Sequence, residues 1–287
     1  MIPLIYHDAY DLNIGSHVFP SRKYRLIKER LGLPTITPRP ATDEDILRVH
    51  TRAWMEGLRD GTLSETELRR LEIPWSPETA AAFRLAAGGT ILASELAMKH
   101  GGAYNIGGGF HHAFAGHGEG FCAIHDVAVA IRKGNLRAIV VDVDVHHGNG
   151  TAAIFANDER VYTFSIHQFD NYPAIKPASD CDIHLRDDVE DDEYLAALQP
   201  ALIKALDDHK PEILYYVAGA DPYEHDQLGG LRLTIEGLRR RDELVLKESA
   251  KRKIPYVITL AGGYALDVDD TVTIHANTAL AGALEHF

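Results

Sequence analysis

Two carboxylates and an imidazole occur at every second position in one segment of the chain. An apolar run at residues 138–141 is followed by Asp142, Asp144 and His146, which alternate with valines. Side chains at alternate positions of a strand point to the same face, so these three polar groups would share one face. Burying them together is costly unless a cation compensates their charge. Because Asp and His both bind zinc, the segment predicts a divalent metal site.

A third ligand for this metal follows a different apolar run. Asp221 comes after residues 213–218 and two further small residues. In an open α/β sheet the carboxyl ends of the strands gather at one edge, which would place Asp221 beside Asp144 and His146. Three protein ligands leave a fourth position for water, as in catalytic zinc sites, and one nitrogen with two oxygens also suits Fe²⁺. The alternative interpretation is that these residues are polar strand ends or turn residues that face solvent.

Groups suited to acid–base chemistry lie in two other segments. His111 and His112 follow a glycine-rich stretch after residues 103–106, and imidazole titrates near neutral pH, so they are candidates for general acid and base. Tyr264 follows two glycines, and a phenol at the sheet edge would donate a hydrogen bond to a developing oxyanion. Each motif alone is also compatible with structural histidines or a surface tyrosine. A second His-His pair occurs at residues 146–147, which shows that this dipeptide is not specific to a catalytic site.

The segments that must position these groups alternate between short apolar runs and longer amphipathic ones. This alternation predicts an α/β fold in which residues 1–287 form a single domain, with an open parallel sheet and helices on both faces. Thr42 and Ser76 are suited to cap helix N-termini, and Gly101 to end a helix. The expected strands are residues 3–6, 103–106, 138–145, 161–166, 213–218 and 255–260. The expected helices are residues 23–31, 43–49, 77–99, 124–132, 191–208, 235–250 and 270–284.

The composition limits the possible partners. The chain is 45% hydrophobic and 25% charged, which is typical of a globular protein. Its formal charge of −13 makes nucleic acid a poor partner and favours cationic ones. Cys122 and Cys181 do not form a disulfide framework, and the N-terminus lacks the pattern of a signal peptide, so a cytoplasmic location is expected. No apolar run is long enough to span a membrane. The oligomeric state cannot be predicted from these features.

Taken in order, the motifs resemble those of the zinc-dependent histone deacetylases over most of the chain. Each motif is weak alone, but five in the same order are specific. They are Gly-Gly-Gly-Phe-His-His at 107–112, Gly-Phe-Cys at 120–122, Asp-Val-Asp-Val-His-His-Gly-Asn-Gly at 142–150, Ala-Asp at 220–221 and Gly-Gly-Tyr at 262–264. The sequence is most similar to the class IV branch, as judged by Gly107–Phe110, Asn149 and residues 50–52, 191–195, 226–231 and 241–245.

The resemblance implies an arginase/deacetylase-type fold and a role for each candidate residue. The Zn²⁺ ligands would be Asp144, His146 and Asp221. The resemblance further implies that Asp142 bonds to His111, that Asn149 bonds to His112, and that Tyr264 binds the oxyanion. A tunnel for the acyl group would be lined by Phe110, Gly120, Phe121 and Tyr172. A structural potassium ion would lie near Asp142, Asp144, His146, Ser165 and Ile166.

The implied reaction is hydrolysis of the amide between an acyl group, acetyl or longer, and the lysine side chain of a protein or peptide. The metal would activate water, and His112 would serve as the base and then as the acid. Two alternatives remain open: a deacylase of acetylpolyamines or other small amides, and a non-catalytic module that binds acyl-lysine. A binuclear ureohydrolase of the arginase type would need further metal ligands that are not found at the matching places.

Two positions depart from the pattern of many relatives. Asn149 replaces an aspartate, and a neutral partner raises an imidazole pKa less than a carboxylate does, which favours a neutral His112. Ala261 replaces a glycine, which would restrict the loop that carries Tyr264.

Overall fold

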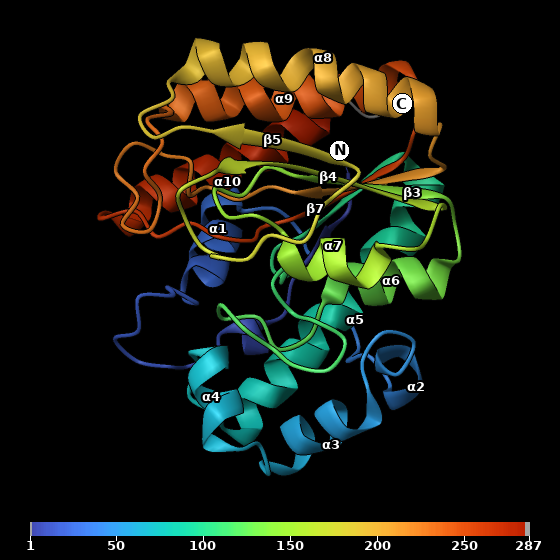
Figure 1. Cartoon of the computed structure of the whole chain (residues 1–287), viewed down its shortest axis with the longest axis vertical. Helices are drawn as coiled ribbons and strands as arrows, with labels where there is room; N and C mark the ends of the chain where they lie inside the picture. Colours follow the sequence, from blue (N-terminus) through green and yellow to red (C-terminus); the bar gives the residue numbers. More distant parts are fainter. Residues whose placement is uncertain (1, 285–287) are drawn as a thin grey trace.

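The computed structural model describes residues 2–284, and within them seven parallel strands form one sheet (Figure 1). The strand order is β1-β2-β7-β6-β3-β4-β5, and every neighbouring pair is parallel. This confirms the predicted open parallel sheet. The strands are β1 (Leu4–Ile5), β2 (Gly102–Asn105), β3 (Ala138–Asp142), β4 (Val161–Gln168), β5 (Cys181–Leu185), β6 (Ile213–Val217) and β7 (Tyr256–Thr259).

Helices cover both faces of the sheet. In Figure 1, α8 and α9 lie above the sheet, α5, α6 and α7 lie below it, and α2, α3 and α4 lie beyond α5. The elements are η1 (Asp8–Tyr10), α1 (Lys23–Leu31), α2 (Asp43–Ile46), α3 (Arg52–Asp60), α4 (Glu65–Leu71), α5 (Pro77–His100), α6 (Asp126–Gly134), α7 (Asn149–Phe155), α8 (Asp191–His209), α9 (Ile235–Lys251) and α10 (Val268–Leu284). Because both faces are covered, every residue of β3 and β6 is buried, which explains their continuous apolar runs.

Capping residues marked the starts of α2 and α5 and the end of α5, and these predictions are confirmed; the helix predicted at residues 43–49 is shorter, because α2 ends at Ile46. The Thr42 side chain accepts a hydrogen bond from the backbone N–H of Asp45, and Asp45 completes a capping box. Ser76 caps α5 through the N–H of Thr79, and Gly101 ends the same helix in the left-handed conformation.

The strand predicted at residues 138–145 is too long, because β3 ends at Asp142. Beyond that point carboxylates bind the backbone N–H groups of alternate residues: the N–H of Asp144 donates to Asp142 Oδ1 (3.2 Å), and the N–H of His146 donates to Asp144 Oδ1 (2.9 Å). Val143 and Val145 still form single backbone hydrogen bonds, to Val217 and Gln168. These local turns stop the strand, since Asp side chains compete for backbone N–H groups. The argument from strand alternation therefore does not explain the positions of Asp144 and His146.

Several elements were not predicted from the sequence: η1, α3, α4, α7 and β5. Helix α7 contains Gly150 and Thr151 near its start, which have low helix propensity, so the surrounding packing determines its structure. Strand β5 lies at the edge of the sheet, and its few buried positions give no continuous apolar run.

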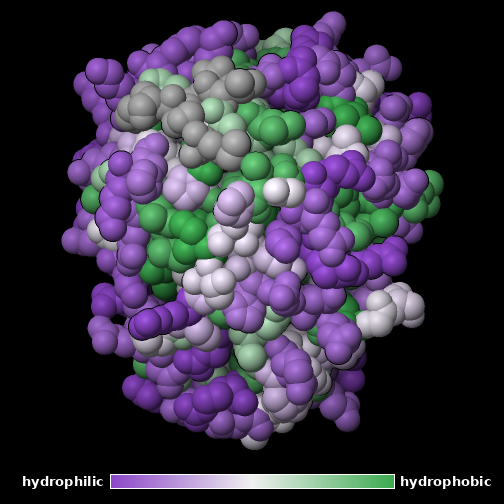
Figure 2. Space-filling model, turned by 180° about the vertical axis from the view of Figure 1, so that it is seen from behind, coloured by the Kyte–Doolittle hydropathy of each residue, from purple (hydrophilic) through white to green (hydrophobic). Residues whose placement is uncertain are grey.

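The surface is mainly hydrophilic on the face shown in Figure 2, with smaller apolar areas between the polar ones. Cys122 and Cys181 are both free cysteines, so they do not form a disulfide. Across residues 2–284, no helix is both long and apolar enough to cross a membrane.

Candidate active site

Three metal-ligating side chains meet at the carboxyl edge of the sheet, beyond the ends of β3 and β6. The ligand atoms of Asp144, His146 and Asp221 all lie within 4.8 Å of one another. His146 Nδ1 lies 3.0 Å from Asp144 Oδ1 and 3.3 Å from Asp221 Oδ2. All three residues are buried. This group was predicted from the sequence, and the fold brings Asp221 to Asp144 and His146 although it comes from a different segment.

Backbone contacts hold both carboxylates in place. The N–H of Gly262 donates to Asp144 Oδ2 (2.8 Å), and the N–H of Val145 donates to Asp221 Oδ1 (2.9 Å). Only glycine fits at position 262, because a Cβ there would lie 1.9 Å from Asp221 Oδ2. That oxygen is buried and has no hydrogen-bond partner within the described chain. A divalent cation would satisfy it, so one nitrogen and two oxygens fit a Zn²⁺ or Fe²⁺ ion here.

The pKa shifts of His146 and Asp221 also favour a cation at this site. Burial lowers the pKa of His146, but the adjacent carboxylates of Asp144 and Asp221 outweigh burial and raise that pKa to about 10. Burial and the charge of Asp144 raise the pKa of Asp221 to about 7. Both shifts arise because two carboxylates share a site without solvent. The site therefore favours an additional positive charge.

The two adjacent histidines have different partners. His111 donates from Nδ1 to Asp142 Oδ2 (2.7 Å), whereas His112 donates from Nδ1 to Asn149 Oδ1 (2.7 Å). Burial lowers the pKa of His111, but the carboxylates of Asp142 and Asp144 raise it to about 9. Burial and the neighbouring His111 and His146 hold the pKa of His112 well below its usual value. The pair thus separates into a histidine that favours the charged form and one that favours the neutral form.

Tyr264 closes the site from the segment after β7. Its backbone N–H donates to Asp226 Oδ2 (2.6 Å), and its ring packs near Phe19 and Phe121. Burial and the charges of Asp144 and nearby carboxylates hold the pKa of its phenol well above 10. The phenol is therefore a neutral hydrogen-bond donor. Asp226 belongs to the run 226–231, so this run positions the tyrosine.

A cavity of about 190 Å³ opens onto these groups. Three of the four residues predicted for the acyl tunnel line it, together with catalytic candidates: Gly120, Phe121, Tyr172, His112, His146 and Tyr264. The fourth, Phe110, does not line this cavity. Its ring packs on Phe83, with 4.7 Å between centroids, and it lines a smaller inner space of about 20 Å³ beside His111 and Gly109.

Three of the five residues predicted for potassium binding are neighbours in the sheet. Asp142 of β3 lies opposite Ser165 of β4, and Ile166 is the next residue along β4. The Ser165 hydroxyl is hydrogen-bonded to His167 Nδ1 (2.9 Å). Asp144 and His146 follow beyond the end of β3, and the potassium site stays a prediction.

Other residues that support the site were not predicted from the sequence. Asp126 is a buried carboxylate that accepts hydrogen bonds from the N–H groups of Gly109 and Phe110, and so shapes the glycine loop before the histidines. Lys23 is fully buried and donates to two backbone oxygens beside Tyr264. Both lie in ordinary amphipathic helices, where a charged residue is normally assigned to the solvent face. The pattern of the sequence therefore gave no signal for them.

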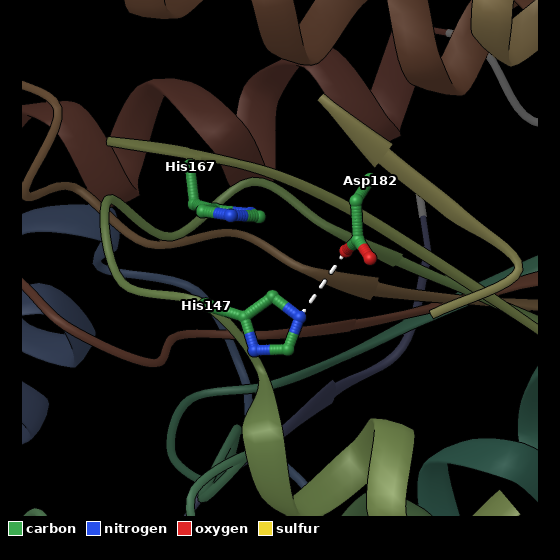
Figure 3. A group of neighbouring side chains, drawn as sticks. All are labelled: His147, His167 and Asp182. Atoms are coloured by element: carbon green, nitrogen blue, oxygen red, sulfur yellow. Dashed lines mark hydrogen bonds and ion pairs between the residues drawn. The ribbon is translucent and has the colours of Figure 1, made fainter. Parts of the chain in front are cut away.

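A second group of metal-ligating side chains lies between β4, β5 and the segment after β3 (Figure 3). It consists of His147, His167 and Asp182. His147 donates from Nε2 to Asp182 Oδ1 (3.1 Å), while His167 pairs with Ser165 through Nδ1 (2.9 Å) and with His184 through Nε2 (2.9 Å). Both ring nitrogens of His167 thus have protein partners. The carboxylate of Asp182 also has protein partners, whereas Nδ1 of His147 is buried without a hydrogen-bond partner within the described chain.

Comparisons with known proteins identify the family of this chain. The family model described as histone deacetylase domain matches residues 17–280. An uncharacterized protein of Picosynechococcus sp. is 38% identical, over 96% of this chain and 96% of that protein. Histone deacetylase 2 of Arabidopsis thaliana is 31% identical, over 92% of this chain and 74% of that protein. The chain therefore belongs to the histone deacetylase family, which confirms the resemblance inferred from the motifs.

Solved structures show the same fold. The HDA15 HD domain superposes with a TM-score of 0.81 at 21% identity, covering 98% of this chain and 88% of that one. An acetylpolyamine aminohydrolase from Burkholderia pseudomallei superposes with a TM-score of 0.81 at 19% identity, covering 99% of both chains. The predicted arginase/deacetylase-type fold is confirmed.

Proposed function

We propose that this protein is a metal-dependent deacylase that hydrolyses the amide between an acyl group and the side-chain amine of lysine. The observation that carries this proposal is the cavity shared by His112, His146 and Tyr264, with Asp144 and Asp221 directly behind His146. This cavity places a set of metal ligands, a candidate base and a candidate oxyanion donor next to one another. Acyl transfer to water needs these three functions together.

Each side chain has a defined part in the reaction. A Zn²⁺ or Fe²⁺ ion held by Asp144, His146 and Asp221 would supply Lewis acidity toward the acyl carbonyl and lower the pKa of water. His112 is held with its proton on Nδ1, so Nε2 is available to take a proton from the attacking water. The phenol of Tyr264 donates to the carbonyl oxygen as negative charge develops there. His112 then returns its proton to the leaving amine.

The net charge of the chain and the residues that line the cavity indicate the class of substrate. The chain carries a formal charge of −13, which favours a cationic substrate such as a basic peptide or a polyamine. Tyr172 and Phe121 offer apolar walls to an acyl chain. The class IV resemblance favours a fatty acyl-lysine substrate over an acetylated one, because each buried methylene contributes about 0.8 kcal/mol. An acetylpolyamine deacylase is the second candidate, supported by the fold shared with the acetylpolyamine aminohydrolase.

A substrate panel tests these alternatives. Values of kcat/KM would be measured for acetyl-lysine and myristoyl-lysine peptides and for an acetylpolyamine, with metal analysis of the same sample. We expect the myristoyl peptide to be the best substrate and the sample to contain one catalytic divalent ion. Equal or higher efficiency with acetyl-lysine would reject the chain-length preference. Hydrolysis of the polyamine alone would favour the second candidate, and binding without turnover would indicate a non-catalytic module.

A further inference from the structure

Glu119 lies directly behind the residue that holds the base. Asn149 donates from Nδ2 to Glu119 Oε1 (2.5 Å), and Asn149 Oδ1 accepts from His112 Nδ1 (2.7 Å). The side chain of Glu119 is only 16% exposed, and its second oxygen lies 3.3 Å from His117 Nε2. A chain of contacts therefore runs from His112 through Asn149 to a largely buried carboxylate.

This carboxylate fixes which way the Asn149 amide faces. The backbone N–H of Gly150 donates to Asn149 Oδ1 (3.0 Å), so reversing the amide would turn its NH₂ group toward another donor. The same reversal would turn the amide oxygen toward the carboxylate of Glu119. Both changes are unfavourable, because donors would face donors and acceptors would face acceptors. With Oδ1 facing His112, the imidazole must donate from Nδ1, and its Nε2 remains the acceptor.

We propose that Glu119 is a positioning residue that acts through Asn149 to keep His112 in the Nδ1–H tautomer, with Nε2 ready to accept a proton. This role rests on the proposed hydrolytic function, in which His112 is the base. A neutral amide carries no charge to orient an imidazole by itself. The carboxylate of Glu119 supplies that charge indirectly: its hydrogen bond with the Asn149 amide polarises the amide oxygen that accepts from His112.

Glu119 also connects the base to the wall of the cavity. The Tyr172 hydroxyl donates to the same Oε1 atom (3.1 Å), and the Tyr172 ring lies edge-on to His112 with 4.9 Å between centroids. Gly120, with φ of +51°, lets this loop approach the base, because a Cβ there would lie 2.8 Å from His112 Cδ2. The carboxylate thus holds both the base and an aromatic wall residue.

The loop that carries Glu119 is fixed by its own backbone. Glu119 and Cys122 exchange backbone hydrogen bonds of 3.2 and 2.9 Å, and Phe121 donates to Leu71 O at the end of α4 (3.0 Å). These contacts do not involve the Glu119 side chain. Replacing that side chain should therefore leave the loop folded and change only the hydrogen bonds to Asn149 and Tyr172 and the contact with His117.

The tautomer of His112 provides a test that does not depend on substrate. Side-chain ¹⁵N NMR spectra would be recorded with and without added Zn²⁺, and the His112 signals assigned from a His112→Ala sample. We expect a single Nδ1–H tautomer in the wild type and a mixture in Glu119→Ala. An unchanged tautomer in Glu119→Ala would overturn the proposal, whether or not the protein hydrolyses any substrate.

Kinetics provide a second, independent test on the best substrate of the panel. Glu119→Ala should lower kcat by about 10- to 100-fold, the usual effect of removing a partner behind an active-site group, with KM nearly unchanged. Glu119→Gln keeps an acceptor for Asn149 but removes the charge, so its loss should be intermediate. If Glu119 acts through Asn149, Glu119→Ala should change kcat less than about twofold in an Asn149→Ala background. An equal loss of kcat in the wild-type and Asn149→Ala backgrounds would overturn the proposal that Glu119 acts through Asn149.

Glu65→Gln is the matched control. Glu65 lies on α4, is exposed, and pairs with Arg69 four residues along the same helix. It carries the same change in charge without contact to Asn149, so its kcat should equal that of the wild type. Absence of turnover in the wild type would count against the proposed hydrolysis, and the NMR spectra would still decide the role of Glu119.

Discussion

The ammonium group of Lys23 donates to the carbonyl oxygen of Ala261 at 2.8 Å, although the two residues are 238 positions apart. It also donates to Gly262 O at 3.0 Å, so one buried cation holds the segment that leads into Tyr264. Ala261 has φ of +55°, a left-handed conformation that costs a residue with a Cβ about 1–2 kcal/mol. The contact with Lys23 helps to hold Ala261 in this conformation.

Replacing Lys23 by Met should therefore weaken the Tyr264 segment. The change removes the ammonium that donates both hydrogen bonds. It leaves the buried carbonyl oxygen of Ala261 without this donor, whereas Gly262 O keeps the N–H of Ala220 at 3.2 Å. The free energy of unfolding should therefore fall by about 1–3 kcal/mol. Displacement of Tyr264 should lower kcat by about 10-fold or more. Denaturant unfolding and steady-state kinetics would measure these effects. Lys23→Arg, which keeps a donor and a charge, is the control, and a Met variant with wild-type stability and kcat would contradict the role of Lys23.

The metal-ligand set makes a separate prediction. Asp144→Ala removes one carboxylate of the group and leaves His146 and Asp221 as an incomplete set, so both metal content and activity should be lost. Metal analysis after dialysis against limiting Zn²⁺ would measure this. Asp182→Ala is a suitable control, because Asp182 belongs to the hydrogen-bonded group of Figure 3 and should not change the catalytic metal content. A full complement of metal in Asp144→Ala, with normal turnover, would show that the assignment is wrong.

Much of this architecture follows from the order of residues alone. The apolar runs of β3 and β6 predicted buried parallel strands, and the sheet edge then predicted that Asp144 and Asp221 would meet. The ends of α5 were also predicted, because Ser76 and Gly101 make local contacts that depend on few other residues. Strands and helix ends that depend on local contacts or on a repeated pattern can therefore be predicted from a single sequence.

Elements and contacts that depend on packing between distant segments could not be predicted from the sequence. Helix α7 and strand β5 have weak patterns of their own and are stabilised by the elements around them. The contacts of Lys23 with Ala261 and of Glu119 with Asn149 join segments whose spacing carries no signal. The sequence therefore predicted the reacting groups, but not the buried charges that orient them.

The two active-site histidines should respond differently to substitution. His112→Ala should remove most turnover while largely preserving bound metal, because His112 acts on water and is not a ligand. His111→Ala should be less severe, since His111 is paired with Asp142 and does not line the outer cavity. Single-turnover rates and metal content would be compared for both variants. If His111 proved essential and His112 dispensable, the two roles would be exchanged.

Tyr264→Phe tests the oxyanion donor with little change in packing. The substitution keeps the ring against Phe19 and Phe121 and removes only the hydroxyl. A neutral phenol forms a stronger hydrogen bond as the carbonyl oxygen becomes negative, so it stabilises the transition state more than the bound substrate. By analogy with other oxyanion donors, kcat should fall by about 10²- to 10³-fold, with much smaller changes in KM and metal content. Near wild-type kcat on an acyl-lysine peptide would mean that Tyr264 only shapes the cavity, and that the electrophilic role belongs to the metal alone.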